Sequence, residues 1–404
     1  MLVAGASIAG PALAHWLRRR GAEVTVVERA PGLRPGGQAV DARGVTREVI
    51  RRMGLDAAVR AARTETAGAH TVDAAGKVLE TFRADDHGGD GYIAEIEILR
   101  GDLSRVLYDD TRDGVEYVFG DRIADLTQDA DGVDVAFAGG GRRRFDLVVG
   151  ADGLHSALRG MVFGPGERFV RHLGHVLAFY TVPNEFGLDR WLIDYQEPGS
   201  GRSAGLRPIQ DATRAMAMFC FPASGLDAGY RDVAAQKRLL RERMAGLGWL
   251  APRLLAHLDD APDFYLDQVA QVVMDRWSSG RVGLVGDAAF SSSPLSGQGT
   301  GLALVGACLL AGELAAAGWD PEAGFAGYER RMRSFAEANQ EIGRLHARSR
   351  GAPGPDAEPS PEFDGEWFTE LIDRALNGAE LPDYAGVPDS GAPAGLPVTS
   401  PAMS

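Results

Sequence analysis

Three short segments, far apart along this chain of 404 residues, constrain its fold more than any other feature. They are Gly5-Ala-Ser-Ile-Ala-Gly10 with Glu28 downstream, Gly150-Ala-Asp-Gly153, and Gly286-Asp287 continuing to Pro294-Leu-Ser-Gly-Gln-Gly299. Each segment alone is a weak signal, because glycine-rich turns are common in proteins. Their order and spacing together predict a single site that holds one extended dinucleotide.

The first segment has the pattern of a phosphate-binding turn. Residues 2–4 predict a short buried strand, and residues 11–20 predict a helix. The free N–H groups and the positive dipole end of that helix would favour a pyrophosphate. Gly5 would supply the tight turn and Gly10 the close packing of helix on strand, whereas Ser7 replaces the usual middle glycine.

The identity of the dinucleotide follows from residues further along the chain. Residues 23–28 predict a second strand that ends at Glu28, and a carboxylate there accepts hydrogen bonds from a ribose and repels a 2′-phosphate. FAD or NAD is therefore favoured over NADP. The two later segments favour FAD, because an NAD dehydrogenase has no need of them. Asp287 would bind a sugar or ribityl hydroxyl, and the helix after Pro294 would stabilise negative charge on a reduced flavin.

Together, the three segments resemble those of class A flavoprotein monooxygenases with the para-hydroxybenzoate hydroxylase fold. More narrowly, the chain is similar to single-component actinobacterial aromatic or polyketide hydroxylases and to tetracycline-inactivating monooxygenases. The resemblance covers roughly residues 1–345. It implies an α/β fold in which a Rossmann-like FAD-binding domain is interleaved with a β-sheet substrate domain, followed by a C-terminal helix and tail.

The resemblance also implies a set of cofactor contacts. The residues that would bind FAD are Gly5, Ser7, Ile8, Ala9, Gly10, Glu28, Arg29, Arg43, Arg100, Asp152, Gly286, Asp287, Pro294, Gly297 and Gly299. Among them, Arg100 would reach the cofactor from the start of a helix, and Asp152 would tie the cofactor region together. The chain departs from the family pattern at Phe290, where relatives often have a histidine. Phe290 cannot relay a proton, so no general base is assigned.

The pattern of strands and helices predicts discontinuous domains. The FAD-binding domain would comprise residues 1–72, 97–167 and 276–345, and the substrate domain residues 73–96 and 168–275. Residues 346–404 would form a linker (351–362), a short helix (367–377) and a disordered tail (386–404). Within the substrate domain we expect a hairpin with its turn at Gly76, strands over 175–182, 191–196, 203–209 and 215–221, and helices over 231–247 and 251–258.

The inward-facing residues of this sheet would line the substrate pocket, with Phe179, Trp191, Arg207, Met216, Met218 and Phe219 as candidates. The resemblance places an active-site strand over residues 36–44. If that segment is extended, Asp41 and Arg43 share a face and Gln38 points the other way. Arg43 would then contact the flavin or an NAD(P)H phosphate, unless it only forms an ion pair with Asp41 that shapes the strand. The candidates to line both flavin and substrate are Gln38, Asp41, Arg43 and Pro294.

Composition and charge exclude several other classes of protein. The net charge of −14, with dispersed basic residues, argues against a nucleic-acid partner. Only Cys220 and Cys308 are present, which fits a reducing cytoplasm and leaves no cysteine-based zinc site, and we expect no metal. Residues 301–319 are apolar enough to suggest a membrane span. They follow a glycine-rich turn and contain Glu313, so we expect a buried helix and no membrane partner.

The resemblance implies an oxygenase reaction. NADPH or NADH would dock transiently and reduce FAD, O2 would add to give a flavin hydroperoxide, and one oxygen would pass to an aromatic or polyketide-type small molecule. Such a protein would be cytoplasmic, a monomer or homodimer, and would act in secondary metabolism or drug inactivation. A flavin-dependent dehydrogenase, a Baeyer–Villiger oxygenase of the same fold and a non-catalytic flavin- or drug-binding protein remain alternatives. A halogenase would need a Trp-x-Trp-x-Ile-Pro segment that the sequence lacks.

Overall fold

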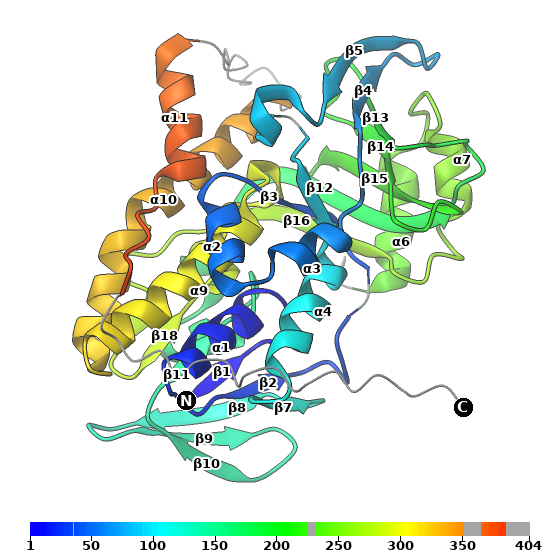
Figure 1. Ribbon diagram of the computed structural model, residues 1–404. Helices are drawn as coiled ribbons and strands as arrows, with labels where there is room; N and C mark the ends of the chain where they lie inside the picture. The colour runs from blue at the N-terminus through cyan, green and yellow to red at the C-terminus, as the bar shows by residue number, and fades with distance from the viewer. Residues whose placement is uncertain (35, 92, 225–231, 351–364, 385–404) are drawn as a thin grey trace, which may run out of the picture.

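Two large β-sheets organise the molecule, with helices packed around them (Figure 1). The structure is a computed structural model that describes residues 1–34, 36–91, 93–224, 232–350 and 365–384. One sheet has six strands and the other has seven, and two smaller sheets have three and two strands. This mixed arrangement confirms the predicted α/β fold class.

The six-stranded sheet carries all three of the glycine-rich segments. Its order is β17 (Ser278–Ser279), β18 (Val282–Leu284), β11 (Val148–Gly150), β1 (Leu2–Ala4), β2 (Thr25–Glu28) and β7 (Glu116–Phe119). From β18 to β7 neighbouring strands are parallel, so their carboxyl ends lie along one edge. The segments follow β1, β11 and β18 and therefore meet at the edge where ligands of open α/β sheets bind.

Helices pack on and around this sheet, and the apolar helix of residues 299–316 is buried along most of its length. They include α1 (Ala9–Arg19), α2 (Val45–Met53), α3 (Asp56–Ala61), α4 (Arg100–Thr111), α5 (Ala157–Phe163), α8 (Asp287–Phe290), α9 (Gly299–Ala316) and α10 (Pro321–Ser349). In the described residues, α9 alone is long and apolar enough to cross a membrane, with a mean hydropathy of 1.6. Its apolar window is 78% buried against neighbours that include α1 and α10, as expected for a core helix.

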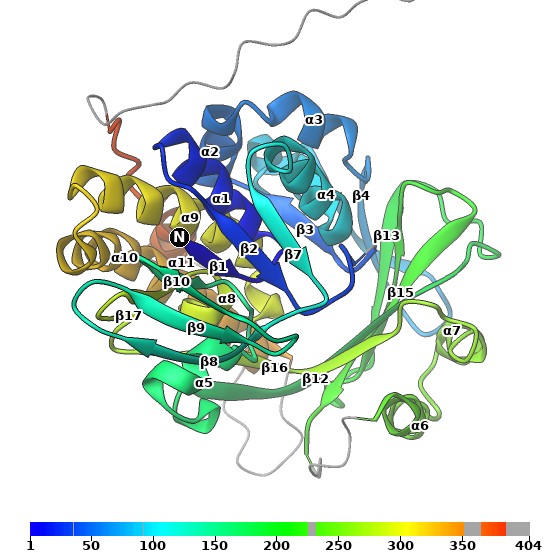
Figure 2. The same ribbon diagram turned by 90° about the horizontal axis from the view of Figure 1, so that it is seen from below.

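The seven-stranded sheet lies beside this unit. Its order is β16 (Tyr265–Val272), β12 (Val170–Pro183), β15 (Arg214–Pro222), β14 (Ser203–Pro208), β13 (Trp191–Gln196), β4 (Gly68–Val72) and β5 (Val78–Arg83). Figure 2 shows α6 (Val233–Arg243) and α7 (Ala251–Ala256) on the face that points away from the six-stranded sheet. The opposite face looks toward a two-stranded sheet of β3 (Ala39–Ala42) and β6 (Ile96–Leu99). A three-stranded sheet of β8 (Ile123–Gln128), β9 (Val133–Phe137) and β10 (Arg142–Phe145) completes the fold.

Most of the expected elements are confirmed. The four strands of the large sheet, the turn at Gly76 and the helix now seen as α11 (Gly365–Asn377) lie where the sequence predicts them, to within a few residues at most ends. One boundary differs, because β4 belongs wholly to the seven-stranded sheet and so lies before the predicted start of the substrate domain at residue 73. The remaining domain division stays a prediction. The expected linker over 351–362 and tail over 386–404 fall outside the described residues.

Candidate functional site

Glycines bring the three segments into contact. Gly5 has a φ of +110°, and a Cβ there would lie 2.4 Å from the carbonyl oxygen of Ala151. A Cβ on Gly10 would lie 1.9 Å from the carbonyl oxygen of Gly5. Gly286, with a φ of +64°, packs against Ala9 at the start of α1. A side chain at the first two positions would collide with backbone, so the turn requires glycine there.

An accessible surface runs through these otherwise buried segments. From residue 2 to residue 17, only Gly5 and Ser7 are not fully buried. From residue 282 to residue 312, the residues that are not fully buried are Asp287, Pro294, Leu295, Gly297 and Gly299. All except Leu295 were expected to contact FAD. The predicted contacts Ile8, Ala9, Gly10 and Gly286 are buried, so their backbone is what they could offer a ligand.

Glu28 lies beside the phosphate-type turn. Its carboxylate accepts hydrogen bonds from the backbone N–H groups of Ala6 and Ala30, each at 2.9 Å. These bonds fix the carboxylate at the carboxyl end of β2, where a nucleotide ribose would reach it. The neighbouring Arg29 is exposed. A ribose contact from Glu28 and a cofactor contact from Arg29 both stay predictions.

Arg100 supplies positive charge to the same turn. From the first residue of α4, it donates a hydrogen bond of 2.9 Å to the hydroxyl of Ser7. A Cβ on Gly37 would lie 2.9 Å from Arg100 Nε, so the glycine leaves room for the guanidinium. Burial lowers the pKa of Arg100, and the nearby Arg34 lowers it further. Among the described residues no carboxylate forms an ion pair with Arg100, and a dinucleotide phosphate is the kind of group that would compensate its charge.

Asp152 organises the second segment. Its carboxylate accepts hydrogen bonds from the Ser156 hydroxyl at 2.5 Å and from the Leu158 N–H at 3.1 Å. The following Arg159 is 1% exposed and donates to the carbonyl oxygen of Ala288 at 2.9 Å. The second and third segments are therefore joined through Arg159, whereas a direct contact between Asp152 and a cofactor stays a prediction.

Asp287 is the acid at the end of β18. Asp287 is an exposed residue of the accessible surface. The protein that surrounds its carboxyl nevertheless reduces the hydration of the charged form, and this burial raises the pKa of the carboxyl. A hydrogen bond with Ser291 opposes that rise. A Cβ on Gly299 would lie 3.9 Å from Asp287 Oδ1, so the acid faces the start of α9. An exposed acid at a helix start, a half-buried arginine and a glycine turn at one sheet edge together fit FAD.

The strand over residues 36–44 meets this surface. Asp41 of β3 forms an ion pair at 3.0 Å with Arg43, which directly follows the last residue of the strand, so the two side chains lie together as expected. A Cβ on Gly297 would lie 3.5 Å from Arg43 Nη1 and 3.9 Å from Asp41 Oδ2. The pair therefore borders the turn before α9. Gln38 precedes β3, where its carbonyl oxygen accepts from the Arg100 N–H at 3.0 Å.

Sequence reasoning missed the acid that faces Asp41. Glu97 of β6 pairs with Asp41 in the register of β3 and β6, and it is 3% exposed. It forms an ion pair with Arg207, and the hydroxyls of Thr64 and Thr66 donate to it at 2.6 and 2.7 Å. The sequence feature that could have identified Glu97 is a carboxylate inside the apolar run Ile-Glu-Ile-Leu. A carboxylate that is buried in such a strand has to be paired.

The two carboxyls respond differently to their surroundings. Burial raises the pKa of Asp41, and the charge of Glu97 adds to the rise, although Arg43 opposes it. Burial also disfavours the charged form of Glu97, but Arg207 and the two threonine hydroxyls outweigh it and lower its pKa. Asp41 is therefore the acid of this cluster that is better placed to hold a proton.

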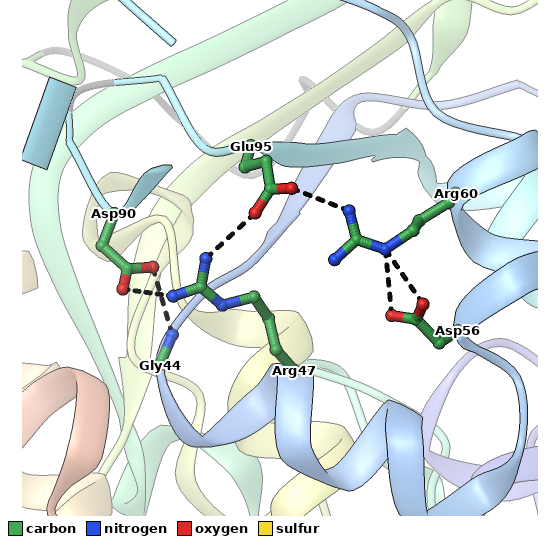
Figure 3. A network of polar contacts seen from close by, with 6 residues as sticks. All are labelled: Gly44, Arg47, Asp56, Arg60, Asp90 and Glu95. Atoms are coloured by element: carbon green, nitrogen blue, oxygen red, sulfur yellow. Dashed lines mark hydrogen bonds and ion pairs between the residues drawn. The ribbon is translucent and has the colours of Figure 1, made fainter. Parts of the chain in front are cut away.

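A second network of ion pairs fixes the turn that follows Arg43 (Figure 3). Asp90 accepts from the Gly44 N–H at 3.2 Å and from Arg47 at 2.6 Å. Glu95 lies between Arg47 and Arg60, and Arg60 also binds Asp56 of its own helix. The network ties α2 and α3 to the segment that leads into β6. It thereby connects the turn after β3 with the residue that precedes β6.

The predicted substrate residues lie on two different faces of the large sheet. Phe179 and Met216 pack with Leu99, and Met218 adjoins this cluster, so these residues face the flavin-binding half. Arg207 shares that face. Phe219 is wrong as a pocket residue, because it packs against Tyr180 in the core under α6 and α7.

Trp191 is also wrong as a pocket residue. Its ring stacks on His70 with centroids 4.3 Å apart, and the guanidinium of Arg83 lies over it. Strand alternation puts it on the same face as Ile193 and Tyr195, which belong to the core under the helices. Both corrections have the same cause, because side chains of neighbouring strand residues point to opposite faces.

Tyr265 of β16 joins the face that Phe179 occupies and was not expected there. The two rings stack with centroids 6.0 Å apart. Burial raises the pKa of the Tyr265 hydroxyl, and the charges of Asp267 and Asp287 add to the rise. Tyr265 therefore extends the predicted substrate face at its β16 edge. No sequence pattern distinguished it from other strand residues.

Comparisons with known proteins agree with this geometry. The FAD binding domain family matches residues 1–342. An uncharacterized protein of Mycobacterium tuberculosis is 47% identical over 387 residues, which cover 95% of this chain and 99% of that protein. A flavin-dependent monooxygenase of Legionella longbeachae is 37% identical over 391 residues, covering 95% and 98%. The solved structure of tetracycline destructase Tet(55) is 39% identical with a TM-score of 0.83, covering 95% and 98%. The chain therefore belongs to the class A flavoprotein monooxygenases and is an FAD-dependent oxidoreductase.

Proposed function

We propose that this monooxygenase consumes NADPH or NADH and inserts one atom of O2 into a planar aromatic or polyketide-type small molecule. The observation that carries the proposal is the accessible surface of Asp287, Pro294 and Gly297, which the Asp41–Arg43 pair borders. Bound FAD would supply the redox chemistry, accepting a hydride from the nicotinamide and activating O2.

The residues at the sheet edge would hold the cofactor. Gly5 and Gly10 let the backbone approach the pyrophosphate, and Arg100 with Ser7 would compensate its charge. Glu28 would accept from the adenosine ribose and Asp287 from the ribityl chain or pyrophosphate region. The amides at the start of α9 would stabilise negative charge on the flavin ring beside Pro294, Gly297 and Gly299.

The large sheet would hold the substrate over that ring. Phe179, Met216 and Met218 offer an apolar and partly aromatic surface, which suits a flat polycyclic molecule. The sheet would also exclude water, which favours oxygen transfer over loss of hydrogen peroxide. Burial raises the pKa of Asp41, so this residue would hold a proton where the flavin-binding surface meets the substrate face of the large sheet.

Likeness to the tetracycline destructases supports a tetracycline-like polyketide as the first substrate to test. Both destructases match 95% of this chain at 35% and 39% identity. The physiological role would then be drug inactivation or the modification of a secondary metabolite. A cytoplasmic location and a monomeric or homodimeric state belong to the same proposal.

The proposal is tested in two steps. Anaerobic titration of the FAD-loaded protein with NADPH, and separately with NADH, should bleach the visible flavin band. Turnover with tetracycline under 18O2 should then give a product that carries one labelled oxygen, with nicotinamide consumed in step. A substrate consumed without label in its product would contradict oxygen transfer, and the carbon skeleton of a labelled product separates hydroxylation from Baeyer–Villiger insertion. Gly10→Ala, which should not bind FAD, serves as the inactive control.

A further inference from the structure

A polar cavity of about 480 Å³ opens at one end of the large sheet, outside the residues assigned to FAD. Three segments line it. They are the stretch after α3 around Arg63, the connection from β12 to β13 around Arg190, and the connection from β14 to β15 around Arg214. Cavities of about 300–1,000 Å³ are the usual size of small-molecule sites. Each segment thus contributes one arginine.

The acids near the cavity make few contacts with these arginines. Glu65 is 3.9 Å from Arg63, and its carbonyl oxygen accepts from Nε of Arg190 at 2.8 Å. Asp189 is the second acid of the lining. In the described part of the chain, the Arg214 guanidinium makes no hydrogen bond or ion pair. Among the lining residues, three guanidinium groups stand against two carboxylates, and the charge of Arg214 also lowers the pKa of Asp211, which lies just outside the lining. The three guanidinium groups are what would bind an anionic ligand here.

The walls of the cavity are fixed before any ligand binds. The side-chain amide of Asn184 donates to the carbonyl oxygens of Leu188 and Ala212, and its oxygen accepts from the Leu188 N–H. This side chain therefore locks the second and third segments together. Glu65 has a φ of +56°, a left-handed conformation that costs free energy in a residue with a side chain. Such conformations persist where the surroundings enforce them and are common at binding sites.

The first segment connects the cavity to the candidate active site. Thr64 and Thr66, on either side of Glu65, both donate to the buried carboxylate of Glu97. Glu97 in turn pairs with Arg207 on the substrate face. On another wall, Ile209 lines the cavity and also packs against the cluster of Phe179, Met216 and Leu99.

We propose that this cavity binds the anionic group of a small molecule, a carboxylate or phosphate held by Arg63, Arg190 and Arg214, while the apolar body extends past Ile209 toward Phe179. The favoured source of the anion is the substrate. The assignment to the substrate rests on the proposed function, whereas anion binding in the cavity does not. The other source of the same chemistry is the 2′-phosphate of NADPH.

Isothermal titration calorimetry on the FAD-loaded enzyme tests the proposal with three probes: inorganic phosphate, salicylate as an aromatic carboxylate, and 2′,5′-ADP as the phosphate-bearing half of NADPH. Arg214→Gln should weaken salicylate and phosphate binding by several-fold, and Arg190→Gln/Arg214→Gln by at least about tenfold. Arg276→Gln is the matched control, because Arg276 is exposed, as Arg190 is, and lies outside the cavity lining. It should leave all three affinities unchanged.

The three probes distinguish the possible outcomes. Equal binding of all three probes in wild type and in Arg214→Gln would overturn the anion site, and the Arg214 side chain makes no hydrogen bond to the described residues whose loss could unfold the protein. If only the binding of 2′,5′-ADP weakens in Arg214→Gln, the assignment of the anion to the substrate is overturned, and the cavity binds the 2′-phosphate of NADPH. Because the titration needs no turnover, a failure of oxygen transfer in the 18O2 experiment leaves the result for anion binding unaffected.

Discussion

Arg207 of β14 reaches across to Glu97 of β6 and forms an ion pair with it, joining the seven-stranded sheet to the two-stranded sheet that carries Asp41. The side chain of Glu97 is 3% exposed and that of Arg207 is 17% exposed, so solvent screens the pair weakly. The contact sets how the substrate face sits over the strand of Asp41 and Arg43. The ion pair thereby fixes the position of the two halves of the candidate site relative to each other.

Glu97→Gln should destabilise the protein by about 3 kcal/mol, because it removes the buried carboxylate that forms the ion pair with Arg207. Urea denaturation of the apoprotein followed by circular dichroism measures the loss. Glu48→Gln is the control, since Glu48 forms an exposed pair with Arg51 and should cost at most about 1 kcal/mol. Equal losses in the two variants would contradict a structural role for the Glu97–Arg207 pair.

Gly10→Ala should abolish FAD binding. The added Cβ would lie 1.9 Å from the carbonyl oxygen of Gly5, so α1 has to move away from the turn that presents its amides. The purified variant should lack the visible flavin absorbance and should not regain it when FAD is added. Gly160→Ala, in α5, is the matched control, because a Cβ there meets nothing within 4 Å. Yellow, FAD-loaded Gly10→Ala protein would refute the turn as the pyrophosphate site.

Asp287 should make the stability of the apoprotein depend on pH. Burial raises its folded pKa above the ordinary value of 3.8, so the protonated form stabilises the fold below about pH 4 and this contribution is lost as pH rises through the folded pKa. Asp287→Asn cannot ionise. Its unfolding free energy, relative to wild type, should therefore increase between pH 4 and pH 7, while its affinity for FAD falls.

Denaturation curves of both apoproteins at several pH values measure the first effect, and flavin fluorescence titration measures the second. A stability difference that does not change with pH would mean that Asp287 ionises in the folded protein as easily as in the unfolded chain. Unchanged FAD affinity would remove Asp287 from the cofactor site. The two outcomes are independent, because one is measured without the ligand.

Sequence reasoning succeeded where the constraint is local. The contacts of Gly5 and Gly10 follow from a turn of a few residues, and the sequence predicted that turn correctly. It failed to identify Glu97, because the partner that explains a buried acid lies 110 residues away in Arg207. The sequence also could not show which face of the large sheet lines the substrate pocket. Helices cover one face and the flavin-binding half covers the other, so both faces carry apolar residues.

Met218 and Phe219 are neighbours on β15 that test this choice of face directly. Met218 adjoins the cluster of Phe179 and Leu99 on the candidate substrate face, whereas Phe219 is 1% exposed and packs on Tyr180 under the helices. Met218→Ala should raise the KM for the substrate several-fold with a small loss of stability, because it removes surface from a site that a ligand fills. Phe219→Ala should cost about 3–5 kcal/mol of stability through the cavity it leaves.

Phe219→Ala should nevertheless keep the wild-type KM at a temperature where it is folded, since its side chain does not reach the substrate face. Thermal unfolding and steady-state kinetics on both variants, with tetracycline as the first substrate, measure the two effects side by side. The reverse pattern, an altered KM in Phe219→Ala and a large stability loss in Met218→Ala, would place the pocket under α6 and α7. That result would contradict the orientation of the sheet over the flavin, because alternation allows only one of the two side chains to face it.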